Sequence, residues 1–242
     1  MDRKSAAWHS PNAGRTLGVV RWGWWGRPVI FFPTGGGDAL DCERFGMVRA
    51  LTPLIEAGRI KLYAVDSLSR QSWIDPSVAP ADKVALQDRY DAWLTDELVP
   101  WIREDCEGDT TPMVVTGASI GAFLAWSAAT RHPDLFSLMI GLSGTYQMDR
   151  RMDGHWDRDW YLHDPCQFIP NIPDGALLEQ LRESFFVFGL GRLWENPTYT
   201  AAAAGALSAR GIPHHVEVWG GDSGHDWPTW RSMLPAALRR LA

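Results

Sequence analysis

Short apolar runs alternate along the chain with longer segments in which apolar residues recur at helical spacing. The short runs predict strands at residues 17–21, 29–32, 60–65, 113–115, 138–142, 184–189 and 215–219. The longer segments predict helices at residues 43–57, 82–104, 122–130, 198–210 and from 228 onward. Strands that alternate with helices are typical of a mostly parallel sheet with helices on both faces. The pattern therefore predicts an α/β protein.

Two connections depart from this alternation. Residues 22–27, rich in Gly and Trp, are short enough to join the first two strands as an antiparallel hairpin at the sheet edge. Residues 144–174 show no clear period and contain several aromatic and proline residues. Long ordered loops are more often functional than decorative, so we expect this segment to form a small lid or a pocket wall. Nothing marks a linker or a repeat, so residues 1–242 are expected to form one domain.

The sequence Gly117-Ala118-Ser119-Ile120-Gly121 lies between a predicted strand and a predicted helix. The G-x-S-x-G motif in this context is typical of a nucleophile elbow, a sharp turn that exposes a serine hydroxyl. The turn needs residues without bulk two positions before and after the serine, and Gly117 and Gly121 meet that need. The alternative is a glycine-rich turn with a helix-capping serine, which predicts no partner residues elsewhere. Ser119 is therefore the candidate nucleophile.

The candidate general base is His225. In proteins with this elbow an acid and then a histidine follow the serine along the chain, the histidine after the last strand. His225 lies in Gly224-His225-Asp226-Trp227, after the predicted strand at 215–219. The other histidines are placed less suitably, in the N-terminal arm, in a helix end, in the irregular segment or at the start of the last strand: His9, His132, His155, His163, His214 and His215.

The candidate acid is Glu195. The acid is expected after the penultimate strand, at 184–189, and Glu195 is the one carboxylate in the loop 190–197. Glutamate can orient an imidazole and stabilise its protonated form, as aspartate does. Asp222 and Asp226 are the alternatives, but both flank His225 in its own loop and are better placed to shape that loop. A surface carboxylate near the following helix is the remaining alternative for Glu195.

Backbone N–H groups are expected to complete the site as an oxyanion hole. One donor is predicted to be the N–H of Ile120, directly after the serine, and the other comes from the loop after an early strand. The loop Pro33-Thr34-Gly35-Gly36-Gly37-Asp38 follows the strand at 29–32, and we favour Gly36, with Gly35 next. A dinucleotide-binding G-x-G-x-x-G is excluded because position 40 is Leu40.

These segments together resemble the Putative esterase family of α/β-hydrolases, which includes esterase D-like enzymes and mycolyltransferases. The chain is most similar to a bacterial branch with five motifs, here Phe32-Pro33-Thr34-Gly35-Gly36-Gly37, Asp66-Ser67, 117–121, Trp194-Glu195 and His225-Asp226-Trp227. The resemblance runs from about Ser10 to the C-terminus, with one departure at Asn196, where an acidic residue is more usual. It implies the α/β-hydrolase fold, with Ser119 as nucleophile, Glu195 as acid and His225 as base.

Composition limits the partners. The net charge of -6 gives no reason to expect nucleic acid or an anionic membrane, and it disfavours strongly anionic substrates. Three scattered cysteines indicate a reducing compartment, and the polar N-terminus is unlike a signal peptide. No stretch approaches the ~18 apolar residues of a membrane helix. We therefore expect a cytoplasmic protein whose partner is a small-molecule ester; the oligomeric state stays open, a homo-oligomer included.

The chain has 14 Trp, many of them in loops or just beyond strands. Large rings often fill the space under long loops, but aromatic walls also bind apolar substrates. Trp194 and Trp227 adjoin the candidate acid and base, and Trp160 lies in the segment 144–174. These three tryptophans are the candidate substrate-binding residues.

The sequence predicts a serine-dependent carboxylic ester hydrolase that acts through an acyl-enzyme on Ser119. An acyltransferase with the same residues and a non-catalytic ligand-binding protein of the same fold are the alternatives. No cofactor and no metal are implied, because the base and the oxyanion hole supply what a metal would.

Overall fold

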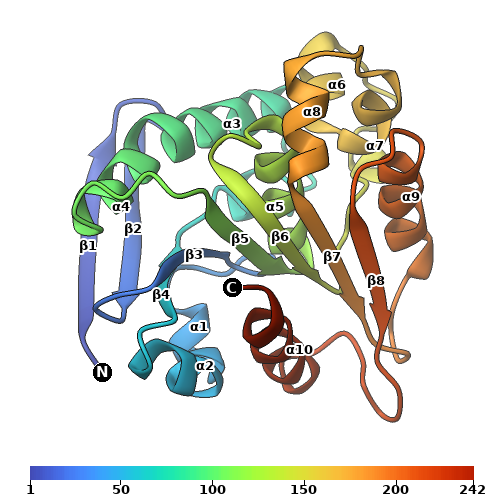
Figure 1. Cartoon of the computed structure of the whole chain (residues 1–242). Coiled ribbons are helices and arrows are strands. Elements are labelled where there is room, and N and C mark those ends of the chain that lie inside the picture. The colour runs from blue at the N-terminus through green and yellow to red at the C-terminus, as the bar shows by residue number, and fades with distance from the viewer.

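The computed structural model describes residues 1–242 and is built on one eight-stranded sheet (Figure 1). The sheet order is β1-β2-β4-β3-β5-β6-β7-β8; β2 is antiparallel to β1 and β4, and all other neighbours are parallel. The predicted mostly parallel sheet is confirmed. The strands are β1 (Arg3–Ser10), β2 (Arg15–Trp22), β3 (Arg27–Phe32), β4 (Ile60–Val65), β5 (Met113–Ala118), β6 (Phe136–Leu142), β7 (Phe185–Leu190) and β8 (His214–Val218).

The predicted hairpin between the first two apolar strands is wrong. Strand β4 lies between β2 and β3, with Val65 opposite Val19 of β2 and Leu62 opposite Val29 of β3. The turn that was expected to close the hairpin is pressed against the start of β4, where a Cβ on Gly26 would lie 2.5 Å from the Arg59 carbonyl carbon. The antiparallel partner of β2 is β1, an edge strand with mostly exposed side chains, which therefore lacks an apolar period.

Ten helices surround the sheet (Figure 1). Their bounds are α1 (Asp41–Arg44), α2 (Met47–Glu56), α3 (Pro80–Trp93), α4 (Val99–Asp105), α5 (Ile120–Arg131), α6 (Arg158–His163), α7 (Pro165–Phe168), α8 (Ala176–Glu183), α9 (Pro197–Ser208) and α10 (Trp227–Leu241). A π-helical turn, Leu94–Leu98, joins α3 to α4, so the predicted helix 82–104 is nearly continuous. The predicted helix 43–57 is interrupted at Gly46, whose φ is 75°.

Two apolar clusters fill the space between the sheet and the helices, one on each face. Successive strand residues alternate between them, because side chains along a strand point to opposite faces. In β3, Ile30 and Phe32 belong to the cluster under α3 and α5, whereas Val29 and Phe31 belong to the cluster under α2 and α10. Figure 1 shows α1, α2 and α10 on one side of the sheet and α3, α5 and α9 on the other. None of the helices has the length and apolar character needed to cross a membrane.

Candidate active site

Ser119 lies at the sharp turn between β5 and α5, with φ 57° and ψ -119°. This backbone conformation is unfavourable for a residue with a Cβ and is found mostly where function requires it. The two flanking glycines make the turn sterically possible. A Cβ on Gly117 would lie 2.4 Å from the carbonyl of Gly121, and a Cβ on Gly121 would lie 2.4 Å from the Phe32 carbonyl oxygen. The predicted elbow is therefore present, with a half-buried serine at its tip.

The loop after β7 and the loop after β8 are joined by backbone hydrogen bonds. The N–H of His225 donates to the Leu193 carbonyl at 3.0 Å, and the N–H of Arg192 donates to the Ser223 carbonyl at 2.7 Å. Two glycines permit this approach, because a Cβ on Gly191 would lie 2.5 Å from Ser223 oxygen and one on Gly224 would lie 2.6 Å from Leu193 oxygen. The pairing places Glu195 beside His225.

The carboxylate of Glu195 faces the imidazole of His225, with 3.6 Å between Oε2 and Nδ1. The Glu195 side chain is only 6% exposed, whereas that of His225 is 31% exposed. The other carboxylate oxygen, Oε1, accepts the Ser143 hydroxyl at 2.5 Å and the Gly191 N–H at 2.9 Å. The structure thus brings the predicted acid and base together and anchors the acid from the side away from the imidazole.

The pKa of Glu195 reflects this environment. Burial acts to raise the pKa, but the contacts with His225, Ser143 and the Gly191 N–H outweigh it and hold the pKa below its ordinary value. Glu195 is therefore an anion at neutral pH. An anion in this position stabilises the positive charge that His225 gains when it accepts a proton.

Ser143 is a site residue that the sequence did not single out. It follows β6 with φ 48°, and its N–H donates to the Gly189 carbonyl of β7 at 2.7 Å. Its hydroxyl accepts the indole N–H of Trp230 at 2.9 Å while donating to Glu195. A chain of hydrogen bonds therefore runs from Trp230 through Ser143 to Glu195. The only signal in the sequence was a polar residue directly after a buried strand.

The residues proposed for the oxyanion hole lie at the same edge of the sheet. The N–H of Ile120 starts α5, so it has no partner within the helix. Gly36 has φ 73° in the loop after β3, and no atom lies within 4 Å of the position of a Cβ there. A Cβ added to Gly35 would lie 3.7 Å from Ile120 Cδ1, so this loop passes close to the start of α5. The two proposed donors thus lie at the start of α5 and in the loop after β3, and their role as an oxyanion hole remains a prediction.

Asp222 and Asp226 do not approach the imidazole as ion-pair partners. The Asp226 carboxylate caps α10 by accepting the Trp227 N–H at 2.7 Å. Asp222 is exposed and makes no side-chain hydrogen bond or ion pair. Asp226 thus shapes the loop, as expected for a residue that flanks His225.

The three candidate substrate-binding tryptophans have different surroundings. Trp194 is 81% exposed and packs over Gly224, next to His225. Trp227 is buried and stacks on Phe45 at 4.7 Å between ring centroids. Trp160 is 1% exposed and packs on Trp73 in the core, so its ring is shielded from substrate. The prediction that Trp160 binds substrate is therefore corrected. Trp160 is a core residue, because the side of α6 that carries it faces the interior of the protein.

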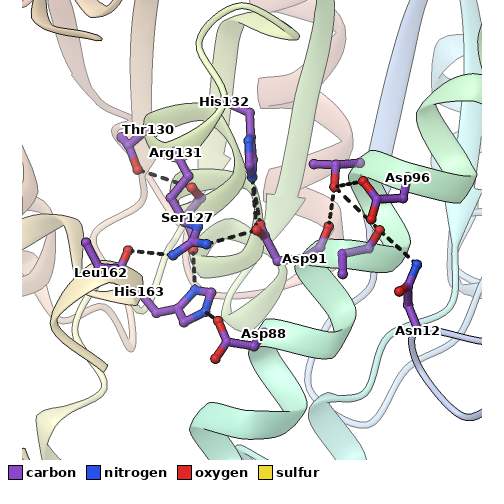
Figure 2. Close-up of polar contacts among 12 residues, drawn as sticks. Asn12, Asp88, Asp91, Asp96, Ser127, Thr130, Arg131, His132, Leu162 and His163 are labelled. Atoms are coloured by element: carbon purple, nitrogen blue, oxygen red, sulfur yellow. Dashed lines mark hydrogen bonds and ion pairs between the residues drawn. The ribbon is translucent and has the colours of Figure 1, made fainter. Parts of the chain in front are cut away.

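A second Ser, His and Asp set occurs away from this site (Figure 2). The ring of His163 of α6 lies between Ser127 of α5 and Asp88 of α3, with Nδ1 3.5 Å from the Ser127 hydroxyl and Nε2 2.5 Å from Asp88 Oδ1. Ser127 and His163 are fully buried, so no substrate reaches this serine. The set fastens α6 to the helices beneath it, which holds part of the segment 144–174 in place.

Ser119 itself makes no side-chain hydrogen bond, and none joins it to His225. Hydrogen bonds between a catalytic serine and its base often tighten only in the complex with substrate. No group of three or more His, Cys, Asp or Glu side chains is placed to hold a metal ion. A cavity of about 550 Å³ lies at the opposite edge of the sheet, beside Arg27 and Lys61, and includes none of the candidate catalytic residues.

The fold is that of α/β-hydrolases, as comparison with solved structures shows. A ferulic acid esterase superposes with a TM-score of 0.76 at 15% identity, over 98% of this chain and 96% of that one. An S-formylglutathione hydrolase from Staphylococcus aureus gives 0.73 at 15% identity, over 99% and 98%. MPT51 from Mycobacterium tuberculosis gives 0.70 at 18% identity, over 100% and 98%.

The family follows from the sequence match. Residues 43–241 match the family described as Putative esterase, so the chain belongs to that family. The predicted resemblance and the predicted α/β-hydrolase fold are both confirmed. A search of curated proteins finds no match. Membership of the family makes this protein a hydrolase of the esterase type.

Proposed function

We propose that this protein is a carboxylic ester hydrolase that works through an acyl-enzyme on Ser119. The observation that carries the proposal is the strained backbone of Ser119, which has φ 57°. The glycines two positions before and after it occupy places that have no room for a Cβ. Such strain persists only where the surrounding structure enforces it, and it clusters at functional sites. A helix-capping serine has no need of it, and Ser119 forms no capping hydrogen bond.

The reaction follows from the residues around the serine. His225 takes the proton from the Ser119 hydroxyl as the oxygen bonds to the ester carbonyl carbon. The N–H groups of Ile120 and Gly36, with Gly35 beside them, stabilise the oxyanion. The bond to the alcohol oxygen then breaks, and His225 gives that oxygen the proton. Water, deprotonated by His225, then attacks the acyl carbon; the bond to the Ser119 oxygen breaks, His225 returns the proton to that oxygen, and the acid leaves.

Glu195 is proposed as the positioning acid of this reaction. It is buried, ionised and fixed by Ser143 and Gly191. It therefore holds the Nδ1 side of the imidazole in place. A fixed carboxylate selects the tautomer in which the other ring nitrogen is free to accept the serine proton. Trp194 is proposed to contact the substrate, because its exposed ring lies next to His225.

A fluorophosphonate probe tests the proposal against the two alternatives. Rapid phosphonylation of wild-type protein, absent in Ser119→Ala, supports an activated serine, and a non-catalytic binding protein gives no labelling. Turnover of p-nitrophenyl acetate in buffer, with and without an added alcohol, then separates hydrolysis from acyl transfer. An acyltransferase forms mostly the new ester when alcohol is present, which would overturn hydrolysis as the main reaction.

A further inference from the structure

A polar cavity of about 190 Å³ lies beside the proposed oxyanion hole. It is bounded by the start of β2, the loop after β3 and the loop after β4. Because β2 runs antiparallel to β4, its start lies next to the end of β4. Gly36, proposed above as an oxyanion donor, forms part of the wall. The cavity therefore opens at the edge of the sheet where Ser119 follows β5.

The carboxylates of this cavity are already engaged. Asp66 accepts the N–H of Gly18 at 2.7 Å and the N–H of Ala39 at 2.9 Å, one on each oxygen. Asp38 forms an ion pair with Arg44 at 3.1 Å. Neither aspartate pairs with an arginine of the cavity wall, so both serve to hold the loop after β3 in its conformation.

The arginines of the cavity are not engaged. Arg15 and Arg70 line it, and neither makes a side-chain hydrogen bond or an ion pair within the protein. The Nε of Arg15 is buried and has no hydrogen-bond partner. Neither guanidinium group therefore has an acceptor within the protein. The cavity thus offers two guanidinium groups to an anion.

We propose that this cavity is an acyl-side subsite for a carboxylate, so that the preferred substrates are esters of acids with a second, terminal carboxylate. The inference rests on the proposed ester hydrolysis at Ser119. Arginine matches a carboxylate with two parallel hydrogen bonds, which favours it over a neutral group of similar size. The net charge of -6 by itself predicts weaker binding of an anionic substrate. Salt screens that charge because it is spread over the whole surface, so the two unpaired guanidinium groups close to the ligand have the larger effect.

The position of His225 assigns the subsite to the acyl group. His225 protonates the leaving alcohol, and it follows β8, on one side of β5 in the sheet. The cavity lies on the other side of β5, by the loops of β3 and β4. Two strand spacings separate β5 from β4, roughly 10 Å. The second carboxylate is therefore expected at the end of a chain of several methylene groups.

Matched p-nitrophenyl esters test this inference. The suberic acid monoester and the octanoate ester have similar chain length, and they differ in the terminal carboxylate. We expect wild-type kcat/KM to favour the suberate ester by about tenfold or more. Arg15→Gln and Arg70→Gln should each bring this ratio towards one, and Arg15→Lys should restore part of it. Arg49→Gln, on the exposed face of α2, is the matched control and should leave the ratio unchanged.

The outcomes separate this inference from the proposed function. Octanoate turnover without preference for suberate, or a ratio that survives both Arg→Gln changes, overturns the subsite alone. If the wild-type protein turns over neither ester, both the proposed ester hydrolysis and the subsite are overturned. A third ester, of octanoic acid with 4-hydroxybenzoate, carries the anion on the leaving group. A preference for this ester that depends on Arg15 and Arg70 would overturn the acyl-side assignment.

Discussion

The hydroxyl of Ser143 lies 2.5 Å from Oε1 of Glu195, and this contact fixes the carboxylate that faces His225. Ser143 is in turn held by the indole N–H of Trp230 at 2.9 Å. Because Oε1 of Glu195 accepts two hydrogen bonds, the carboxylate cannot turn freely. Its other oxygen, Oε2, therefore stays directed at the imidazole of His225. The geometry of the acid and base therefore depends on residues outside both loops.

Ser143→Ala should weaken both catalysis and stability. The change removes one hydrogen bond from an ionised group and leaves the buried Trp230 N–H unpaired, which costs about 2 kcal/mol of unfolding free energy. A looser Glu195 should lower kcat roughly tenfold with KM little changed. Urea unfolding and steady-state kinetics measure both effects. Ser127→Ala removes a buried serine hydroxyl far from Glu195 and is the control; an equal loss of kcat there would contradict the role of Ser143.

Glu195→Gln keeps the shape of the side chain and removes its charge. Protonated His225 then loses its counter-charge, so kcat should fall about 10³- to 10⁴-fold. Asp226→Asn and Asp222→Asn should each change kcat by less than about fivefold, because one carboxylate caps a helix and the other is free in solvent. If either of these two variants is the one that loses activity, Glu195 is not the acid.

Two glycine substitutions should have opposite effects on stability. Gly121→Ala places a Cβ 2.4 Å from the Phe32 carbonyl oxygen and 2.5 Å from that of Pro33, a collision with backbone. It should lower the free energy of unfolding by about 3 kcal/mol or more. Gly205→Ala, inside α9 with no atom within 4 Å, should add about 1 kcal/mol. Thermal unfolding of the two variants, compared with that of the wild-type protein, measures both effects. A Gly121→Ala variant as stable as the wild type would contradict the geometry of the elbow.

Asp164 should make stability depend on pH. Burial raises its pKa from 3.8 to about 6, so between these pH values the folded protein holds a proton that the unfolded chain releases. Stability should therefore fall as the pH rises through this window, by up to about 3 kcal/mol. Asp164→Asn can still accept the Cys166 N–H at the start of α7. Urea unfolding from pH 4 to 7 should show a smaller fall in this variant, and an identical fall would rule Asp164 out as the cause.

The elbow was predictable from the sequence because its parts are neighbours along the chain. Gly117, Ser119 and Gly121 set the turn by their own backbone needs, and the flanking strand and helix have clear periods. The order of acid and histidine after the serine led to Glu195 and His225. Their contact then depends on Gly191 and Gly224, whose close approach to the facing loops is seen only in the fold.

Features that depend on distant partners were not predictable. The position of β4 between β2 and β3 is a property of the whole sheet, and a short turn alone suggested a hairpin. The sequence does not distinguish the buried Trp160 from the solvent-facing Trp194, because the two side chains are chemically identical. Only the packing of α6 against the core shows which of them is accessible. Ser143 lies 52 positions from Glu195 along the chain, so no local pattern joins them.

Mass spectrometry of protein quenched with acid during turnover of p-nitrophenyl acetate tests the role of Ser119 most directly. We expect a trapped adduct with the mass of one acetyl group on the peptide that contains Ser119, and none in Ser119→Ala. That variant should fold normally and lose turnover by several powers of ten, about 10⁶-fold in triad enzymes measured elsewhere. Steady turnover with an adduct on another residue, or near-normal activity in Ser119→Ala, would contradict Ser119 as the nucleophile.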